Sequence, residues 1–352
     1  MKNCLIVIPA YDPNENLVQY VKDLIAHGFS SLLIIDDGSK DETKPIFDKL
    51  ALLEEVDMIR HSVNLGKGRA LKNAINYFLN HYEKKGWEGL ITVDSDGQHA
   101  ISDVKRIYQK LNRSSNMLCL GVRDFNQKNV PFKSKFGNKL TKKMFGLLYG
   151  KKVTDTQTGL RGLSKDVLYH FIALNGERFN YETNMLIEAV RHEVDFSEVT
   201  IETIYIDDNS ETHFRPIADS VQIYGLLFAN FIRYMWISLF SFVIDISLFR
   251  LFIFIFSYLT IGPRIGVATI GARLLSSMFN YTANKYAVFN SKKSVKSTFI
   301  NYYLLMLFQL TVSWLSVYLI YRSTGYPEAN IKILVDLVLF FISYRIKRSW
   351  VF

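Results

Sequence analysis

The chain has 352 residues, enough for two domains of ordinary size. Residues 1–217 carry 29 Lys and Arg against 29 Asp and Glu, whereas residues 218–352 carry 13 against 4, so the net charge of +9 belongs wholly to the second part. A neutral first part argues against nucleic acid as its partner. Excess Lys and Arg in an apolar second part is typical of a membrane protein.

The N-terminal and cysteine-containing segments predict a reducing, cytoplasmic setting for the first part. Cys4 and Cys119 both lie in apolar, strand-like runs, which favours buried thiols over a disulfide framework or a metal cluster. The first apolar run, from Leu5 to Ile8, is too short for a signal peptide and ends at Pro9.

Apolar runs and helical spacings alternate along the first part of the chain. This alternation predicts an α/β fold, Rossmann-like, with a mostly parallel sheet covered by helices. Strands are predicted at 4–10, 32–35, 56–60, 89–93 and 117–122, and helices at 14–27, 42–53, 69–82 and 102–112.

Polar residues follow four of these strands at the point where each strand ends. In parallel sheets, ligands bind beyond the carboxyl ends of the strands, so we expect these residues to form one site. They are Pro9, Ala10 and Tyr11 at the end of the first strand, Asp36, Asp37, Gly38 and Ser39 after the second, Asp94, Ser95 and Asp96 after the fourth, and Gly121, Val122 and Arg123 at the end of the fifth.

The Asp94-Ser95-Asp96 turn is a candidate metal site. Two carboxylates one residue apart can share Mg²⁺ or Mn²⁺, and Gln98 offers a third oxygen. The pair Asp36 and Asp37 is expected on the neighbouring strand, which strengthens this interpretation. A solvated acidic turn is the alternative.

The segment Asn64-Leu65-Gly66-Lys67-Gly68 suits a loop that approaches an anion. Its glycines lack the spacing of a P-loop and of a dinucleotide-binding turn. Gly66 would allow close backbone approach and Lys67 would supply charge. An ordinary turn is equally compatible with this short motif.

Residues 131–152 predict an amphipathic helix at a membrane interface. Phe136, Leu140, Met144, Leu147 and Leu148 would share one face, and the segment holds seven lysines and no acidic residue. Such a helix lies in the interface, where each Lys contributes about 1 kcal/mol of attraction to an anionic leaflet. Packing of the same face on the sheet is the alternative.

Five segments in this order resemble the GT-A-fold family-2 glycosyltransferases, in particular the dolichyl-phosphate mannose synthase and bacterial polyprenyl-phosphate glycosyltransferase branch. They are IPAYDPNENL, LLIIDDGSKDET, HSVNLGKGRALKNAI, TVDSDGQH and DTQTGLRGLS. The QxxRW motif of processive synthases does not occur in the sequence. The resemblance covers residues 3–217. It implies a nucleotide-sugar donor bound by Pro9, Ala10, Tyr11, Glu15, Asp36, Asp37, Gly38, Ser39, Gly66, Lys67, Asp94 and Ser95, with Asp94, Asp96 and Gln98 at the metal.

The same resemblance implies a polyprenyl phosphate acceptor. Such a phosphate is mostly a dianion at neutral pH and needs no general base, so we expect direct in-line attack with inversion at the anomeric carbon. A hydroxyl acceptor on a lipid-linked saccharide is the alternative, and its base would be Asp155 or Glu182. Asp94, Asp96 and Arg123 are the predicted catalytic residues, and Arg123, Lys133, Ser134, Lys135, Asn138, Arg161 and Glu182 the predicted acceptor residues.

Four apolar stretches predict a membrane domain over residues 232–352, joined to the domain of residues 1–217 by a connection at 218–231. The stretches are 232–257, 264–288, 299–321 and 329–346. Lys and Arg between the second and third stretches and after the fourth place both termini in the cytoplasm. Residues 280–289 and 343–352 match without gaps at four positions, which predicts two hairpin repeats.

Asp245, Arg273 and Asp336 fall within the predicted spans and are expected to face the bundle interior or an aqueous path. The whole stretch resembles the four-span GtrA-like family, which implies either a membrane anchor or a flippase for the lipid-linked sugar. A transporter whose first domain only binds nucleotide-sugar is a further alternative. The bacterial cytoplasmic membrane, undecaprenyl phosphate, UDP-glucose or UDP-N-acetylglucosamine, and a tetrameric homo-oligomer are expectations from the family.

Overall fold

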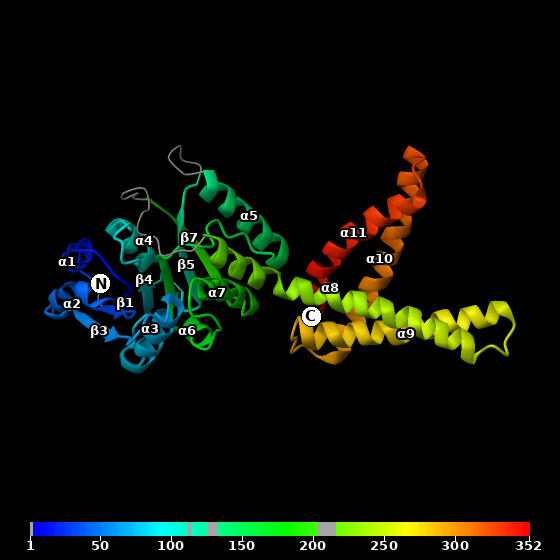
Figure 1. Cartoon of the computed structure of the whole chain (residues 1–352), viewed down its shortest axis with the longest axis horizontal. Coiled ribbons are helices and arrows are strands. Elements are labelled where there is room, and N and C mark those ends of the chain that lie inside the picture. The colour runs from blue at the N-terminus through cyan, green and yellow to red at the C-terminus, as the bar shows by residue number, and fades with distance from the viewer. Residues whose placement is uncertain (1–2, 112–113, 126–131, 203–215) are drawn as a thin grey trace. The chain divides into compact units, whose positions relative to one another are not determined.

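The computed structural model describes residues 3–111, 114–125, 132–202 and 216–352. The chain forms two compact units, Met1–Leu227 (unit 1) and Phe228–Phe352 (unit 2). Figure 1 shows a sheet with helices in unit 1 and long helices in unit 2.

Unit 1 is built on a seven-stranded sheet with the order β3-β2-β1-β4-β6-β5-β7. Its β6 pairs antiparallel with both neighbours, and all other pairs are parallel. The carboxyl ends of β1, β2, β4 and β5 therefore share one edge with the amino end of β6. The strands are β1 (Cys4–Ala10), β2 (Leu32–Asp36), β3 (Val56–Arg60), β4 (Gly89–Thr92), β5 (Met117–Arg123), β6 (Arg161–Ser164) and β7 (Asp195–Ile201).

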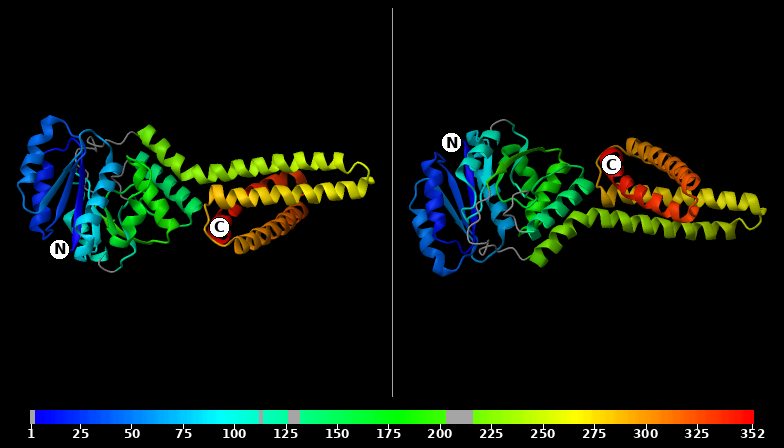
Figure 2. Two further views of the ribbon diagram at one scale, coloured as in Figure 1. Left: turned by 90° about the horizontal axis from the view of Figure 1, so that it is seen from below. Right: turned by 90° about the horizontal axis from the view of Figure 1, so that it is seen from above.

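Helices cover both faces of this sheet (Figure 2). Successive residues of β1 point to opposite faces, and Leu5, Ile6, Val7 and Ile8 are all fully buried. The predicted α/β architecture is confirmed. The helices are α1 (Asn16–Ala26), α2 (Lys44–Ala51), α3 (Lys67–His81), α4 (Ile101–Leu111), α5 (Phe132–Tyr149), α6 (Lys165–Phe171) and α7 (Asn180–Arg191), with short 3-10 turns η1 (Asp41–Thr43) and η2 (Glu83–Lys85).

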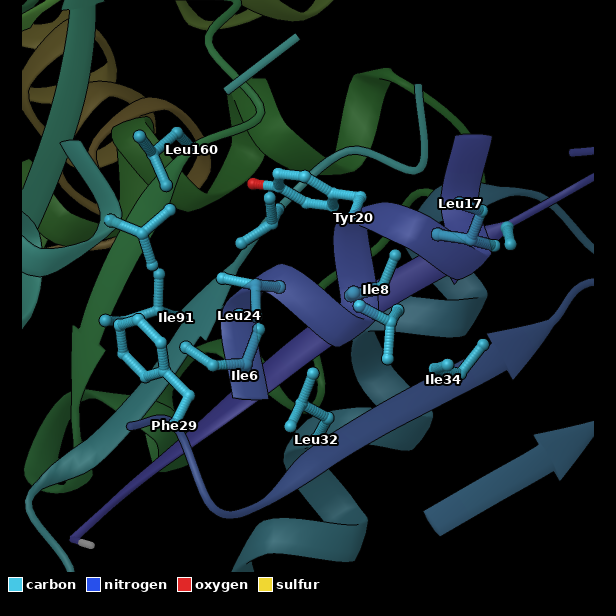
Figure 3. Close-up of a cluster of buried hydrophobic side chains, with 14 of the residues drawn as sticks. Ile6, Ile8, Leu17, Tyr20, Leu24, Phe29, Leu32, Ile34, Ile91 and Leu160 are labelled. Carbon is cyan, nitrogen blue, oxygen red and sulfur yellow. The ribbon is translucent and has the colours of Figure 1, made fainter. Parts of the chain in front are cut away.

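The main core lies between the sheet and helices α1 and α4. Leu17 and Leu24 of α1, spaced seven residues apart on one helix face, pack with Ile6, Ile8 and Ile34 of the strands (Figure 3). Burial of this continuous apolar layer fixes the strands, and with them the positions of the turns at their carboxyl ends.

The sheet order corrects one expectation. Strand β1 lies between β2 and β4, so Asp36 and Asp37 are not on the strand next to Asp94 and Asp96. The prediction assumed that the two strands followed by acidic turns, β2 and β4, are neighbours in the sheet. In a sheet that grows outward on both sides of β1, they are not.

Unit 2 consists of two helical hairpins, α8–α9 and α10–α11 (Figure 1). Two segments of the described chain are long and apolar enough to cross a membrane, Val221–Ile255 and Val295–Thr324. Many large apolar side chains are exposed, including Phe254 at 76% and Leu310 at 67%. The helices are α8 (Pro216–Ile255), α9 (Ile261–Ala283), α10 (Val295–Thr324) and α11 (Glu328–Ile346), and π-helical turns η4 (Asn284–Val288) and η5 (Lys347–Val351) follow α9 and α11.

The two π-helical turns begin at positions that the sequence match makes equivalent. Asn284 and Lys347 are 63 residues apart, as are Phe289 and Phe352, whose rings stack with centroids 5.3 Å apart. A π turn is rare, so its occurrence at the same place in both hairpins supports the predicted repeat.

Candidate active site

Asp94, directly after β4, is held by groups of the chain itself. Its Oδ1 accepts a hydrogen bond from Lys67 Nζ at 2.7 Å, and its Oδ2 lies 3.2 Å from His99 Nε2. Gly159 lies against the carboxylate so closely that a Cβ there would overlap it. Burial disfavours ionisation of Asp94, but Lys67 and His99 outweigh it and hold the pKa of the carboxyl well below its usual range.

Lys67 joins two carboxylates that are distant in the sequence. Its Nζ lies 2.7 Å from Asp94 and 2.9 Å from Oε1 of Glu182, a buried residue of α7. Burial acts to lower the pKa of Lys67, but the two carboxylates overcome this effect and raise it. The sequence placed Lys67 at the donor and Glu182 at the acceptor, and the structure brings the two side chains together.

Asp96 is the more available carboxylate of the acidic turn. Its Oδ1 accepts the backbone N–H of Gln98 at 3.0 Å, and no described residue donates a hydrogen bond to its Oδ2. Burial and the neighbouring charge of Asp94 raise the pKa of Asp96. The environment therefore favours a cation at this carboxylate.

The turn after β2 is held in place by contacts within the chain. Asp36 is buried, accepts the Ser39 N–H at 2.8 Å and pairs with Arg60 at 3.1 Å. The Ser39 hydroxyl accepts the Asp12 N–H at 3.0 Å, which ties the end of β2 to the end of β1. Gly38 has φ +70° and lies against the backbone of residues 63–64, where a Cβ would overlap main-chain atoms.

Asp37 fixes the loop that precedes α3. It accepts the backbone N–H groups of Leu65 at 2.9 Å and Gly66 at 2.8 Å, and its Oδ1 lies 2.6 Å from His61 Nδ1. Asn73 Nδ2 donates a hydrogen bond to His61 Nε2. The Nδ1–H group of His61 therefore donates a hydrogen bond to Asp37. Both oxygens of Asp37 are thus used to hold the loop that carries Lys67.

Arg123, the last residue of β5, is held in a fixed orientation by a buried carboxylate. Its Nε and Nη2 donate to Asp155 at 2.7 and 3.2 Å, a bidentate pair, while 35% of its side chain stays exposed. Asp155 itself is fully buried and also accepts the Gln157 N–H at 3.1 Å.

Residues 154–161, between α5 and β6, connect the two sides of the site. Thr158 donates to the Gly121 carbonyl, and Thr92 donates to the Gly159 carbonyl at 2.7 Å. Arg161 is fully buried and donates to three backbone carbonyls, those of Thr156, Thr158 and Glu182. Arg161 therefore organises this segment through carbonyl groups and does not reach the surface.

The helix α5 divides its apolar residues between the protein and solvent. Phe145 and Leu148 are buried, whereas Leu140 and Leu147 are exposed at 37% and 41%. Tyr149, also on α5, donates to the Leu227 carbonyl of α8 within unit 1. The predicted helix over 131–152 is therefore present over Phe132–Tyr149, and only part of its apolar face is exposed.

The remaining predicted acceptor residues lie on α5. Asn138 donates to the Thr154 carbonyl at 2.9 Å, and Lys135 is exposed. The side chains of Lys133, Ser134 and Phe136 lie outside the described residues.

The remaining predicted donor residues lie at or just beyond the ends of β1 and β4. Ala10 is buried, Pro9, Tyr11 and Ser95 are partly exposed, and Glu15 pairs at the surface with Lys49 at 2.9 Å.

A divalent cation fits this site when substrate supplies some of its ligands. No group of three or more His, Cys, Asp or Glu side chains within the described ranges is arranged to hold a metal. Asp96 offers a carboxylate oxygen, whereas both oxygens of Asp94 are engaged by Lys67 and His99. Mg²⁺ commonly binds one or two carboxylates together with substrate phosphates, which agrees with this donor set.

The three predicted charges of the membrane unit are paired. Asp245 lies 3.2 Å from Arg273 and accepts a hydrogen bond from Ser276, linking α8 to α9. Asp336 pairs with Lys332 at 2.8 Å and accepts from Ser313 of α10 at 2.6 Å. Each hairpin is therefore joined by one Asp–Ser hydrogen bond.

Comparisons with known proteins agree with this architecture. A model described as glycosyl transferase family 2 matches residues 5–171, and one described as the GtrA/DPMS transmembrane domain matches residues 224–352. The chain therefore belongs to glycosyl transferase family 2, its sheet is of the GT-A type, and it carries a GtrA/DPMS transmembrane domain.

Three relatives illustrate the range of the family. A UDP-N-acetylglucosamine–dolichyl-phosphate N-acetylglucosaminyltransferase from Methanococcus voltae is 32% identical over 219 residues, covering 57% of this chain and 86% of the relative. An uncharacterized protein of Methanocaldococcus jannaschii is 32% identical over 206 residues, 57% of this chain and 82% of the relative. A polyprenol monophosphomannose synthase from Mycolicibacterium smegmatis is 25% identical over 206 residues, 56% and 76% of the two chains.

Proposed function

We propose that this protein transfers a hexose from a nucleotide-sugar to the phosphate of a polyprenyl phosphate, with inversion at the anomeric carbon. The names of two relatives support a polyprenol or dolichyl phosphate as the acceptor. UDP-glucose or UDP-N-acetylglucosamine is the proposed donor, and the second of these is the donor in the name of the Methanococcus voltae relative.

The proposal of a phosphate acceptor over a hydroxyl acceptor rests on the ion pairs of Asp155 and Glu182, the two carboxylates that could act as a base. Asp155 is fully buried in a bidentate pair with Arg123, and Glu182 is buried and paired with Lys67. A sugar hydroxyl acceptor needs a carboxylate that can take its proton, and both candidates are engaged by cations. A phosphate acceptor needs no base, and Arg123 presents a preorganised guanidinium to an anion.

The chain's own residues would divide the reaction as follows. Arg123 orients the acceptor phosphate, and Asp155 holds Arg123 in place. Asp96 would hold Mg²⁺ or Mn²⁺, which offsets the negative charge that develops on the diphosphate leaving group. The attacking phosphate oxygen forms a bond to the anomeric carbon as the bond to the nucleoside diphosphate breaks.

Several further features are part of the same proposal. Residues 1–217 would act in the cytoplasm, residues 218–231 would connect them to the membrane, and residues 232–352 would cross it, with both termini cytoplasmic. A bacterial plasma membrane with undecaprenyl phosphate, transfer of the product across the bilayer and a homo-oligomeric assembly remain predictions.

The test uses the full chain in liposomes that contain polyprenyl phosphate. The protein is incubated with UDP-glucose, UDP-N-acetylglucosamine or GDP-mannose, with Mn²⁺ or Mg²⁺ or with chelator, and the lipids are analysed by mass spectrometry. We expect a new lipid-phosphohexose from one donor, in the inverted anomeric configuration by NMR. Retained configuration, or no product from any donor by protein that still binds nucleotide, would contradict the proposal.

A further inference from the structure

The membrane unit buries a lysine that no carboxylate neutralises. Lys347, the first residue of η5, is only 8% exposed. Its Nζ lies 5.2 Å from the ring centroid of Tyr234 on α8 and 4.9 Å from that of Tyr302 on α10. Across the part of unit 2 that the structure describes, no Asp or Glu pairs with this ammonium and no acceptor lies within hydrogen-bond distance of it.

Two aromatic faces do not replace a counter-ion. A ring attracts a cation through its quadrupole, but this attraction is weaker than the hydration that a buried ammonium loses. A charged lysine at this depth is therefore stabilised when an anion completes its surroundings.

The repeat shows that the fold does not require a cation at this position. Asn284 is the equivalent residue of the first hairpin, and it begins η4 just as Lys347 begins η5. Asn284 is fully buried and neutral, and it bonds to Asn280 of its own hairpin at 2.8 Å. The π turn thus forms equally well without a lysine, which separates Lys347 from the needs of folding.

The loop between the two hairpins also favours an anionic ligand. The sequence contains no Asp or Glu between Asp245 and Glu328, so the loop between the hairpins is purely basic. Lys285, also buried, donates to the Lys293 carbonyl at 2.6 Å in this loop. The phosphate of a lipid is an anionic group that membrane interfaces supply.

We propose that Lys347, between Tyr234 and Tyr302, binds the phosphate group of a lipid, at a site separate from Arg123. The ammonium donates hydrogen bonds to the phosphate oxygens, and the tyrosine rings hold the lysine side chain in place. Lys347 begins the π turn of η5, and such turns occur frequently at functional sites.

The experiment measures binding of radiolabelled polyprenyl phosphate to the full chain in nanodiscs of neutral phosphatidylcholine. Lys347→Met is compared with Lys296→Met, an exposed lysine at the start of α10, and with Arg123→Gln. We expect two saturable sites in the wild type and one in Arg123→Gln. Lys347→Met should weaken one site by at least about tenfold, and Lys296→Met should change neither.

The variants separate this proposal from the proposed function. If Arg123 binds no acceptor, the wild type shows one site, and Lys347→Met still removes it. Lys347→Arg keeps the positive charge, so it should still bind the lipid phosphate. This variant tests the proposal even where Lys347→Met does not fold. Competition by phosphatidylglycerol would support a general lipid phosphate site, whereas equal competition by inorganic phosphate would overturn a lipid ligand. Unchanged stoichiometry and affinity in Lys347→Met would overturn the proposal itself.

Discussion

Replacing Lys67 with Met should destabilise unit 1, because it leaves two carboxylates close together without their shared cation. Lys67 lies 2.7 Å from Asp94 and 2.9 Å from Glu182, and the three side chains are 17%, 31% and 6% exposed. Breaking a buried pair by removing one partner costs about 3–5 kcal/mol. The exposure of Asp94 places the expected loss near the lower limit, at about 3 kcal/mol.

The matched control is Lys49→Met. Lys49 pairs with Glu15 at 2.9 Å, the same separation, but both side chains are more than half exposed. Exposed pairs contribute roughly 0–1 kcal/mol, so this variant should unfold almost like the wild type. The comparison therefore tests the buried, doubly paired Lys67 against an exposed lysine that pairs with one carboxylate at a similar distance.

Thermal unfolding of the full chain in detergent measures both variants. Trp87 is the one tryptophan of unit 1, so its emission, with the other three replaced by Phe, follows this unit. A loss of about 3 kcal/mol lowers the Tm of a unit of this size by roughly 6–12 °C. Lys49→Met should shift it by about 3 °C or less.

The pH dependence gives a second check. In the wild type, Lys67 holds the pKa of Asp94 below its usual range against the effect of burial, so this stabilisation is present above the unfolded pKa of about 3.9 and is lost as pH falls through the folded pKa. In Lys67→Met the pKa of the Asp94 carboxyl should rise, because burial then acts without the opposing charge of Lys67. The difference in the free energy of unfolding between the wild type and the variant should therefore be greatest near neutral pH and shrink toward about pH 4.5. A deficit equal to that of Lys49→Met, or one independent of pH, would refute the reasoning.

Three substitutions test the catalytic edge through initial rates of lipid-phosphohexose formation. Asp96→Asn should lower kcat by roughly 10²–10³ with an unchanged Tm, because it removes the carboxylate charge expected at the metal; a smaller effect would place the metal elsewhere. Arg123→Lys loses the bidentate contact with Asp155 and should reduce kcat/KM for the acceptor by about tenfold, leaving the KM of the donor within about twofold. Gly159→Ala adds a Cβ that overlaps the Asp94 carboxylate, so donor turnover should fall at least about tenfold, and normal turnover would show that the segment can move aside.

Strands β1, β2, β4 and β5 were predictable because they are buried on both faces. Such strands are continuous apolar runs, and Leu32–Asp36 and Met117–Arg123 lie within one residue of their predicted positions. Strand β6, Arg161–Ser164, was not predicted. It contains a glycine and two polar residues, and its place between β4 and β5 depends on antiparallel pairing that no local pattern indicates.

The candidate site was predictable as an edge of the sheet but not as a set of contacts. The acidic turn after β4 and Arg123 at the end of β5 follow from strand ends, which parallel strands bring together. The pairing of Lys67 with Glu182 joins residues 115 positions apart, and the arrangement of helices α3 and α7 creates it. Asp37 is expected at the nucleotide, which stays a prediction, and the structure adds that its two oxygens hold the loop before α3.

The segment of residues 154–161 explains why the DTQTGLRG sequence belongs to the site although it contributes few exposed side chains. Asp155 orients Arg123, and Gly159 provides the space that the Asp94 carboxylate occupies. Arg161 holds the carbonyls of the same segment from within the protein. One buried segment thus sets the position of the predicted donor carboxylate and of the predicted acceptor cation. Because the segment contacts the Asp94 carboxylate through Gly159 and pairs with Arg123 through Asp155, a change in its backbone would affect both sides of the proposed reaction.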